Sequence, residues 1–135
     1  MPYFSDADEV YRYIGGVFRE AGSNDATAAR MRAANVTLQL HYTDPASQLT
    51  VRFSDDFEVI EGPTEVKPDV QLFMAADTAH KFWRGEYNLA VGMAKGQVKS
   101  KGPVNKILKL VPLTKPLFPI YKELVAEKDI AGSAS

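Results

Sequence analysis

Apolar positions in the first third of the chain change from a helical period to a strand period. Between residues 7 and 21 they recur at i, i+3, i+4 and i+7, which predicts an amphipathic helix. Ser5 followed by Asp8 has the spacing of a capping box at the start of this helix. Gly15 and Gly16 lie inside it at a cost of about 1 kcal/mol each relative to alanine, so we expect close packing there. An alanine-rich second helix is predicted over residues 25–34.

A period of two follows directly. Apolar side chains at residues 36, 38, 40 and 42 alternate with polar ones, which is typical of a strand with one buried face. Residues 49–53 show the same alternation, and residues 57–60 are expected to form a third strand after the turn Asp55-Asp56. Strands joined by short turns predict an antiparallel meander.

The second half mixes strands and helices. We expect a strand over residues 70–74, a helix with Asp77 as its N-cap, and a helical stretch over 88–95 that ends at Gly96. Residues 97–101 are predicted as an edge strand, because lysines discourage edge pairing.

Helical periodicity returns at Pro103, which suits a first helical position. Pro112 is expected to interrupt the apolar stripe, and a last helix follows. Residues 129–135 are predicted to be a disordered tail. The pattern predicts an α+β fold, and the length fits one domain over residues 1–135.

Charge is distributed unevenly along the chain. The segment Lys95–Lys122 holds seven lysines and no acidic residue, whereas the remainder has 16 − 7 = 9 basic and 17 acidic residues. This asymmetry indicates either an anionic partner, such as transient contact with an anionic membrane surface, or a set of solvated lysines. The chain has no cysteine, no secretory signal pattern and no membrane-spanning apolar run, so we expect a cytoplasmic protein.

Candidate catalytic residues are few. His41 and His80 have no neighbouring metal-ligand set, and we interpret both as surface histidines. The acidic cluster around Asp55, Asp56, Glu58 and Glu61 is interpreted as a solvated turn and hairpin. We therefore predict no catalytic residue, no metal and no cofactor.

Bulky apolar residues are numerous after residue 70. They are compatible with a closed core, or with a gap between strands and proline-broken helices that an apolar ligand fills. In the second case the Lys95–Lys122 segment would serve as wall and lid.

Three stretches resemble the sterol carrier protein 2 (SCP-2) family, in the form of its stand-alone prokaryotic members. They are residues 68–77 (PDVQLFMAAD), 82–86 (FWRGE) and 96–102 (GQVKSKG), the last with Ser100 where an apolar residue is usual. The resemblance implies a five-stranded, mostly antiparallel sheet covered by helices, with an apolar tunnel between them. It also implies non-catalytic binding, with transfer, of a sterol, fatty acid, acyl-CoA or phospholipid.

By the same resemblance, ten residues would line the tunnel: Phe73, Phe82, Trp83, Leu89, Met93, Val98, Ile107, Leu110, Leu117 and Tyr121.

Two other functions stay open. One is a small enzyme with a cone-shaped α+β pocket for a steroid-like or carbonyl substrate, with Asp56 or His41 as its acid or base. The other is a partner-binding domain with a collapsed pocket. A nucleic-acid partner is not expected, because the lysines lack interleaved aromatics and arginines. Whether two chains form a homodimer is also open.

Overall fold

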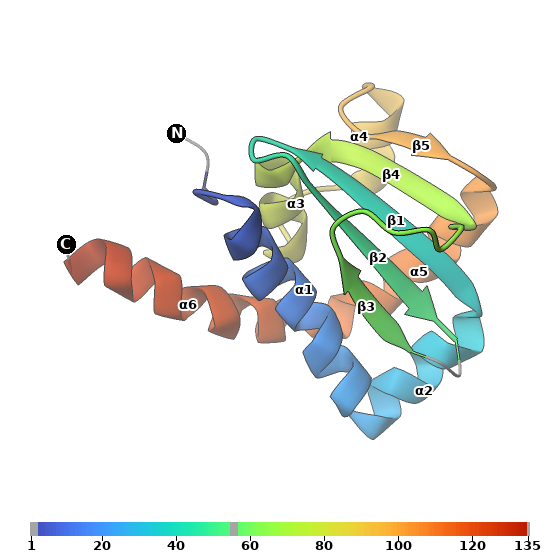
Figure 1. The fold of residues 1–135 in the computed structure, drawn as a ribbon, viewed down its shortest axis with the longest axis horizontal. Helices are drawn as coiled ribbons and strands as arrows, with labels where there is room; N and C mark the ends of the chain where they lie inside the picture. Colours follow the sequence, from blue (N-terminus) through green and yellow to red (C-terminus); the bar gives the residue numbers. More distant parts are fainter. Residues whose placement is uncertain (1–2, 55–56, 135) are drawn as a thin grey trace.

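Five strands form one mixed sheet in the order β3-β2-β1-β4-β5 (Figure 1). The computed structural model describes residues 3–54 and 57–134. The strands are β1 (Val36–Thr43), β2 (Ser47–Phe53), β3 (Glu58–Glu61), β4 (Val70–Ala75) and β5 (Lys99–Lys101). The antiparallel meander β1-β2-β3 is confirmed, β5 is antiparallel to β4, and β1 and β4 are parallel neighbours. The sheet is therefore mostly antiparallel, as predicted.

The helices are α1 (Ala7–Ser23), α2 (Asp25–Ala34), α3 (Ala76–Trp83), α4 (Leu89–Ala94), α5 (Val104–Thr114), a 3₁₀ turn η1 (Lys115–Leu117) and α6 (Phe118–Ala134). They gather behind the sheet and at its side in Figure 1, whereas the segment between β3 and β4 crosses its front. Because side chains alternate along a strand, Leu38, Leu40 and Tyr42 of β1 are buried on the inner face toward the helices.

Helix α1 meets other elements at two of its three glycines, Gly15 and Gly16. A methyl group added at Gly15 would lie 3.6 Å from Leu49 Cδ2 on β2, and one at Gly16 would lie 3.5 Å from Leu124 Cδ1 on α6. Both values are ordinary van der Waals distances, so the two glycines face other elements, as expected, but neither contact requires a glycine. Helix α6 lies alongside α1, although the two helices are separated by most of the chain (Figure 1).

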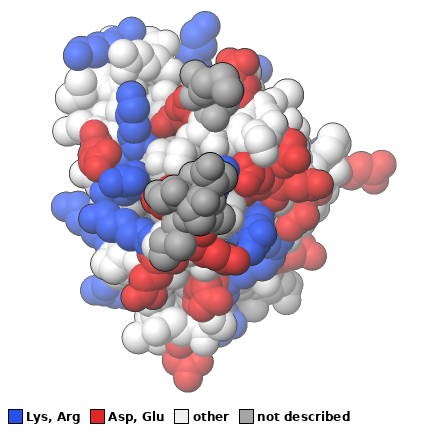
Figure 2. Space-filling model, turned by 90° about the vertical axis from the view of Figure 1, so that its left-hand side faces the viewer, with Lys and Arg blue, Asp and Glu red and all other residues white. Residues whose placement is uncertain are grey.

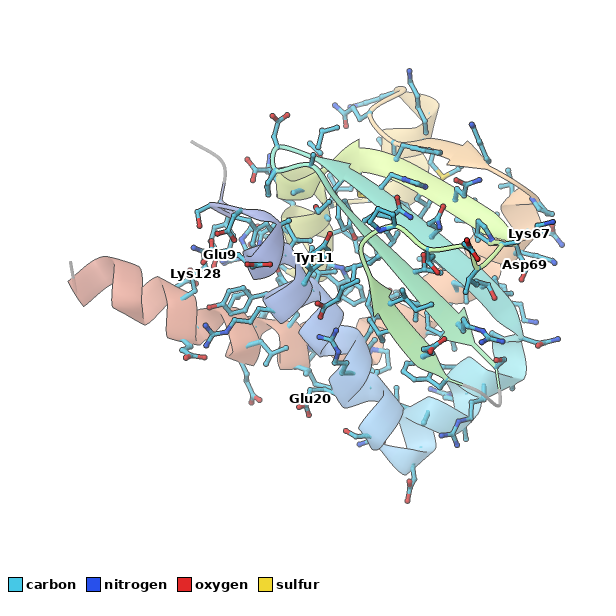
Figure 3. The ribbon with its side chains drawn as sticks, in the orientation of Figure 1. Glu9, Tyr11, Glu20, Lys67, Asp69 and Lys128 are labelled. Atoms are coloured by element: carbon cyan, nitrogen blue, oxygen red, sulfur yellow. The ribbon has the colours of Figure 1, made fainter. Side chains whose placement is uncertain are left out.

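Ion pairs reinforce the contact between α1 and α6. Lys128 Nζ lies 3.0 Å from both carboxylate oxygens of Glu9 (Figure 3). Arg12 Nη2 lies 2.8 Å from Glu127 Oε1. On the face of the molecule drawn in Figure 2, acidic and basic side chains lie close together, as these pairs require.

Two predicted helix starts are wrong in detail. Asp6 caps α1 instead of Ser5, since its carboxylate accepts the Glu9 N–H at 3.0 Å, while Glu9 accepts the Ser5 N–H at 2.7 Å. The N-cap of α3 is Ala75, and Asp77 instead accepts the Tyr3 N–H at 2.9 Å. A carboxylate in the first turn of a helix can accept a hydrogen bond from an N–H of another segment. The local sequence does not show which N–H the carboxylate will accept.

The chain after Pro103 is more continuously helical than predicted. Pro112 lies inside α5 instead of interrupting it, so the Leu108 carbonyl, four residues earlier, receives no N–H donor from residue 112. Helix α6 continues to Ala134, over residues for which the sequence predicts a tail. Ser135 lies outside the described residues.

Candidate functional site

An apolar cavity of about 50 Å³ lies between the inner face of the sheet and helices α1, α2, α3 and α5. We call it the inner cavity. It is lined by Phe18, Met31, Leu38, Leu40, Tyr42, Phe53, Leu72, Met74, Ala79, Phe82, Trp83, Leu89, Ile107, Leu110, Val111, Leu113 and Thr114. Three of the lining residues, Tyr42, Trp83 and Thr114, carry a nitrogen or oxygen atom in the side chain, and burial raises the pKa of the Tyr42 hydroxyl, which therefore stays protonated.

A wider hollow of about 540 Å³ adjoins the inner cavity between the α3–α4 segment and α5. We call it the outer groove. Phe82, Leu89, Val111 and Thr114 line both spaces, so these four side chains form the partition between them. The outer groove also contains the charged residues Glu86 and Lys115.

Helix α5 covers the inner cavity with one face and meets solvent with the other. Ile107 and Leu110 are buried, whereas Val104 and Leu108 keep about half of their surface exposed. Two lysines on the same helix contact the body of the protein. Lys109 Nζ donates to the Ala34 carbonyl at 3.2 Å, and Lys106 Nζ lies 3.9 Å from Asp69 Oδ1.

The structure brings half of the ten predicted site residues to the inner cavity: Phe82, Trp83, Leu89, Ile107 and Leu110. Met93 lies in the outer groove instead. Val98, Leu117 and Tyr121 are buried in the core without lining either space.

Phe73 lies on the wrong face of the sheet for a cavity residue. Its neighbours Leu72 and Met74 line the inner cavity, so the alternation of β4 directs Phe73 outward. There its ring stacks on His41 with the centroids 4.5 Å apart, and Lys101 Nζ lies 5.4 Å from its centroid. Its assignment to the lining is corrected on this ground.

Sequence reasoning missed twelve of the seventeen lining residues, and two groups among them differ in how far the sequence could have indicated them. Leu38, Leu40 and Tyr42 could have been found, because the period of two already placed them on one buried face. Phe18 on α1 and Met31 on α2 could not, because nothing in the local pattern shows that these helices reach the space under α5.

His80 is buried, not a surface histidine. Its Nδ1 lies 2.8 Å from the Tyr121 hydroxyl, and the Tyr3 ring stacks on it with the centroids 3.7 Å apart. Burial, together with the nearby Arg84 charge, lowers the pKa of His80, although Asp129 and Asp77 oppose the shift. His80 joins the N-terminal segment, α3 and α6, and it does not line the inner cavity.

The other candidate polar residues also lie away from the inner cavity. His41 is on the opposite face of the sheet, with its Nε2 2.8 Å from Gln39 Oε1 and 3.0 Å from Gln71 Oε1. Glu58 and Glu61 pair at the surface with Arg52 and Arg19, respectively. Asp55 and Asp56 lie outside the described residues.

Six of the seven lysines in the Lys95–Lys122 segment are exposed, and Lys106 is half-buried. Within the part of the chain that the structure describes, Lys106 is the one member that forms an ion pair. Exposed apolar side chains lie in and beside the same segment, at Val91, Val104 and Leu108. None of the described helices has the length and apolar character needed to cross a membrane.

The sheet, its helical cover and the inner cavity define an α+β domain with an apolar space between two layers. The SCP-2 sterol transfer family model matches residues 17–115, and the chain therefore belongs to that family. No curated protein matches the chain.

Solved structures share the fold at low sequence identity. Sterol carrier protein 2 from Yarrowia lipolytica, in its apo form, has a TM-score of 0.65 and 20% identity, over 76% of this chain and 87% of that one. Sterol carrier protein domain 2 of Helicoverpa armigera has a TM-score of 0.63 and 14% identity, over 82% and 88%. A conserved hypothetical protein from Thermus thermophilus has a TM-score of 0.58 and 14% identity, over 80% and 82%.

Proposed function

We propose that the protein binds a lipid between the sheet and α5 and transfers it without catalysing a reaction on it. The observation that carries this proposal is the inner cavity, whose lining holds no histidine, lysine or carboxylate. Such a surface gains free energy from burying hydrocarbon, at about 0.8 kcal/mol per methylene. It offers no group that could exchange a proton near neutral pH.

Cargo binding requires α5 to move. The inner cavity, at about 50 Å³, is far smaller than the roughly 300–1,000 Å³ of common small-molecule sites. The volume of the outer groove is within that range, and four side chains separate the outer groove from the inner cavity. Displacing α5 outward would join the two spaces into the tunnel that the sequence resemblance implies. This helix is thus the lid.

The lysine-rich segment supports a further part of the proposal. Exposed lysines without acidic neighbours in the sequence favour transient contact with an anionic membrane surface. The exposed apolar residues on α4 and α5 would then meet the bilayer beside the outer groove. A cytoplasmic location and a homodimer stay predictions from the sequence.

The enzyme alternative receives less support. One of its two candidate residues, His41, is separated from the inner cavity by the sheet. The partner-binding alternative predicts that no lipid binds, so the lipid-binding measurements described next also test this alternative.

A cavity-filling substitution tests the proposal. Ala79 is buried and lines the inner cavity, so Ala79→Leu fills the space that a lipid chain would enter. Ala33→Leu makes the same change at an exposed position of α2 and serves as the control. We expect the wild type and the control to bind a fluorescent fatty acid, and Ala79→Leu to bind it at least tenfold more weakly.

Native mass spectrometry of freshly purified protein supplies a second measurement. A bound lipid mass supports the proposal. Absence of both bound lipid and fluorescent fatty-acid binding in the wild type would contradict it and favour a collapsed pocket.

A further inference from the structure

The hydroxyl of Tyr42 is a polar atom on the apolar wall of the inner cavity. Tyr42 lies near the end of β1 and is 4% exposed. Every side-chain nitrogen or oxygen that is completely enclosed in the described part of the chain has a hydrogen-bond partner. The Tyr42 hydroxyl forms no hydrogen bond among the same residues, so its oxygen is not completely enclosed and borders an open space. The space that Tyr42 lines is the inner cavity, and the hydroxyl therefore faces it.

The other strongly shifted tyrosines have hydrogen-bond partners, unlike Tyr42. Desolvation alone raises the pKa of the Tyr42 hydroxyl. At Tyr3 burial raises the pKa as well, and a hydrogen bond to Asp129 adds to the effect. The Tyr121 hydroxyl, also buried, lies 2.8 Å from His80 Nδ1. A buried tyrosine hydroxyl usually has such a partner, so the Tyr42 hydroxyl is suited to one that comes from outside the chain.

Two other residues of the lining carry polar side-chain atoms. Thr114 directs its hydroxyl to its own helix, where Oγ1 donates to the Val111 carbonyl at 2.6 Å. Trp83 is 3% exposed, and its Nε1–H, like the Tyr42 hydroxyl, takes part in no hydrogen bond within residues 3–54 and 57–134. An indole N–H only donates, whereas a tyrosine hydroxyl donates or accepts. An acceptor oxygen is the group that both residues can bind.

Charge restricts this oxygen to an uncharged group. The lining of the inner cavity holds no histidine, lysine, arginine or carboxylate. A charged group that entered it would lose its hydration without gaining an opposite charge, whereas a hydroxyl or carbonyl group loses far less. The lining therefore favours a hydroxyl or carbonyl oxygen over a carboxylate.

The volumes of the two spaces indicate which end of a lipid would reach Tyr42. The inner cavity, at about 50 Å³, admits the slender end of a chain, whereas the outer groove, at about 540 Å³, has room for a bulkier head group. The outer groove also offers the charged residues Glu86 and Lys115 to a polar head, and Tyr42 does not line it. Tyr42 would thus meet the end of the chain that is remote from the head.

We propose that Tyr42 is a specificity-determining residue, whose hydroxyl binds an uncharged hydroxyl or carbonyl oxygen at the far end of the cargo chain. This inference rests on the proposed function and specifies its ligand class, a lipid oxygenated at the chain end. The Trp83 Nε1–H is a second donor on the same wall. A plain hydrocarbon end would leave both groups without a partner.

The experiment compares two ligands that differ by one oxygen at the chain end, palmitate and ω-hydroxypalmitate. Tyr42→Phe removes the hydroxyl and keeps the ring. Tyr13→Phe is the matched control, because Tyr13 is also 4% exposed but lines neither the inner cavity nor the outer groove. Calorimetry should show that Tyr42→Phe weakens ω-hydroxypalmitate binding about five- to twentyfold and leaves palmitate within about twofold. In Tyr13→Phe both affinities should stay within about twofold of the wild type. Laurate and ω-hydroxylaurate repeat the comparison with a shorter chain.

Thermal unfolding of the ligand-free variants supplies an independent readout. Removing a hydroxyl that has no partner in the protein should raise the unfolding midpoint of Tyr42→Phe by about 2–5 °C. Tyr121→Phe should lower the midpoint, because it leaves His80 without the Tyr121 hydroxyl. A decrease in Tyr42→Phe as large as that in Tyr121→Phe would show that the Tyr42 hydroxyl stabilises the free protein, and it would overturn the inference.

Two binding results would overturn the inference while leaving lipid binding intact. One is a wild-type protein that binds each hydroxylated ligand at least tenfold more weakly than its parent fatty acid. The other is a Tyr42→Phe variant without selective loss in either ligand pair. A wild-type protein that binds none of the four ligands overturns both this inference and the proposed function.

Discussion

Gly102 is the residue at which backbone geometry limits substitution most directly. Its φ of 104° lies in a region that side chains disfavour, and an added methyl group would lie 2.5 Å from the Asp69 carbonyl oxygen and 3.1 Å from Val70 Cα. Both contacts are with backbone of the segment that enters β4, which cannot move aside as a flexible side chain can. The close approach holds the end of β5 against the start of β4.

We predict that Gly102→Ala lowers the free energy of unfolding by about 3 kcal/mol or more, since strain and overlap add. Gly96→Ala is the control, because Gly96 also has a positive φ, of 77°, but has no neighbouring atom within 4 Å. Its cost should be about 1 kcal/mol. Urea denaturation measures both values, and equal losses would show that the contact with Asp69 contributes nothing.

His80 gives the stability of the protein a dependence on pH. Because burial lowers its pKa in the folded state, the unfolded chain binds more protons below the ordinary histidine pKa of about 6.5. Stability is therefore complete above about pH 6.5 and falls as the pH drops through that value toward the lower folded pKa. We expect His80→Gln to flatten the curve of unfolding free energy against pH below about pH 6.5.

Chemical denaturation at a series of pH values measures this effect, with His41→Gln as the control. A wild-type curve that is flat in this window, or one that His41→Gln flattens equally, would contradict the assignment to His80.

At the scale of elements, α1 contains two glycines with opposite expected responses. At Gly16 a methyl group has ordinary contact distances, 3.5 Å to Leu124 Cδ1, so Gly16→Ala should stabilise the protein by about 0.5–1 kcal/mol through helix propensity. At Gly22 the same methyl group overlaps the Phe57 ring, and Gly22→Ala should destabilise by about 1–3 kcal/mol. Thermal unfolding compares the pair. Stabilisation by both substitutions would show that the Phe57 ring moves aside without lowering the stability of the protein.

The elements themselves could largely be predicted from the sequence. Period and turn chemistry located the five strands, α1, α2 and the C′ glycine Gly96, because these depend on neighbouring residues. Helix starts were less predictable, since Asp77 bonds to Tyr3, 74 positions away.

The candidate site could be predicted from the sequence only in part, because some of its contacts join segments that are far apart in the chain. Phe73 was misplaced although the alternation of β4 directs it outward, so this error was avoidable. The cavity roles of Phe18 and Met31, and the burial of His80 beside Tyr121, follow from packing between segments remote in sequence. No local pattern encodes such contacts.

At the scale of the whole molecule, exposed lysines and exposed apolar side chains lie in the same part of the chain. We predict that the protein binds vesicles containing phosphatidylglycerol more tightly than vesicles of phosphatidylcholine alone, and that high salt weakens this binding. Leu108→Asp should reduce vesicle binding several-fold, because Leu108 is half exposed on the outer side of α5. Vesicle flotation measures the fraction of protein that is bound in each case.

Lys67→Glu is the control for this experiment, since Lys67 lies in the segment that crosses the opposite face of the sheet (Figure 3). Equal binding to both vesicle types, or an equal loss in Lys67→Glu, would contradict a docking role for the α5 side.

The position of the single tryptophan has a practical consequence. Trp83 is the only indole in the chain, it forms part of the wall of the inner cavity, and its ring meets that of Phe18 at a centroid distance of 5.1 Å. Excitation at the red edge of the aromatic band therefore reports on one position in the candidate site, with no label attached. Trp83 fluorescence thus offers a real-time test of whether the proposed lipid enters and leaves the inner cavity, and every variant that keeps Trp83 carries the same internal reporter.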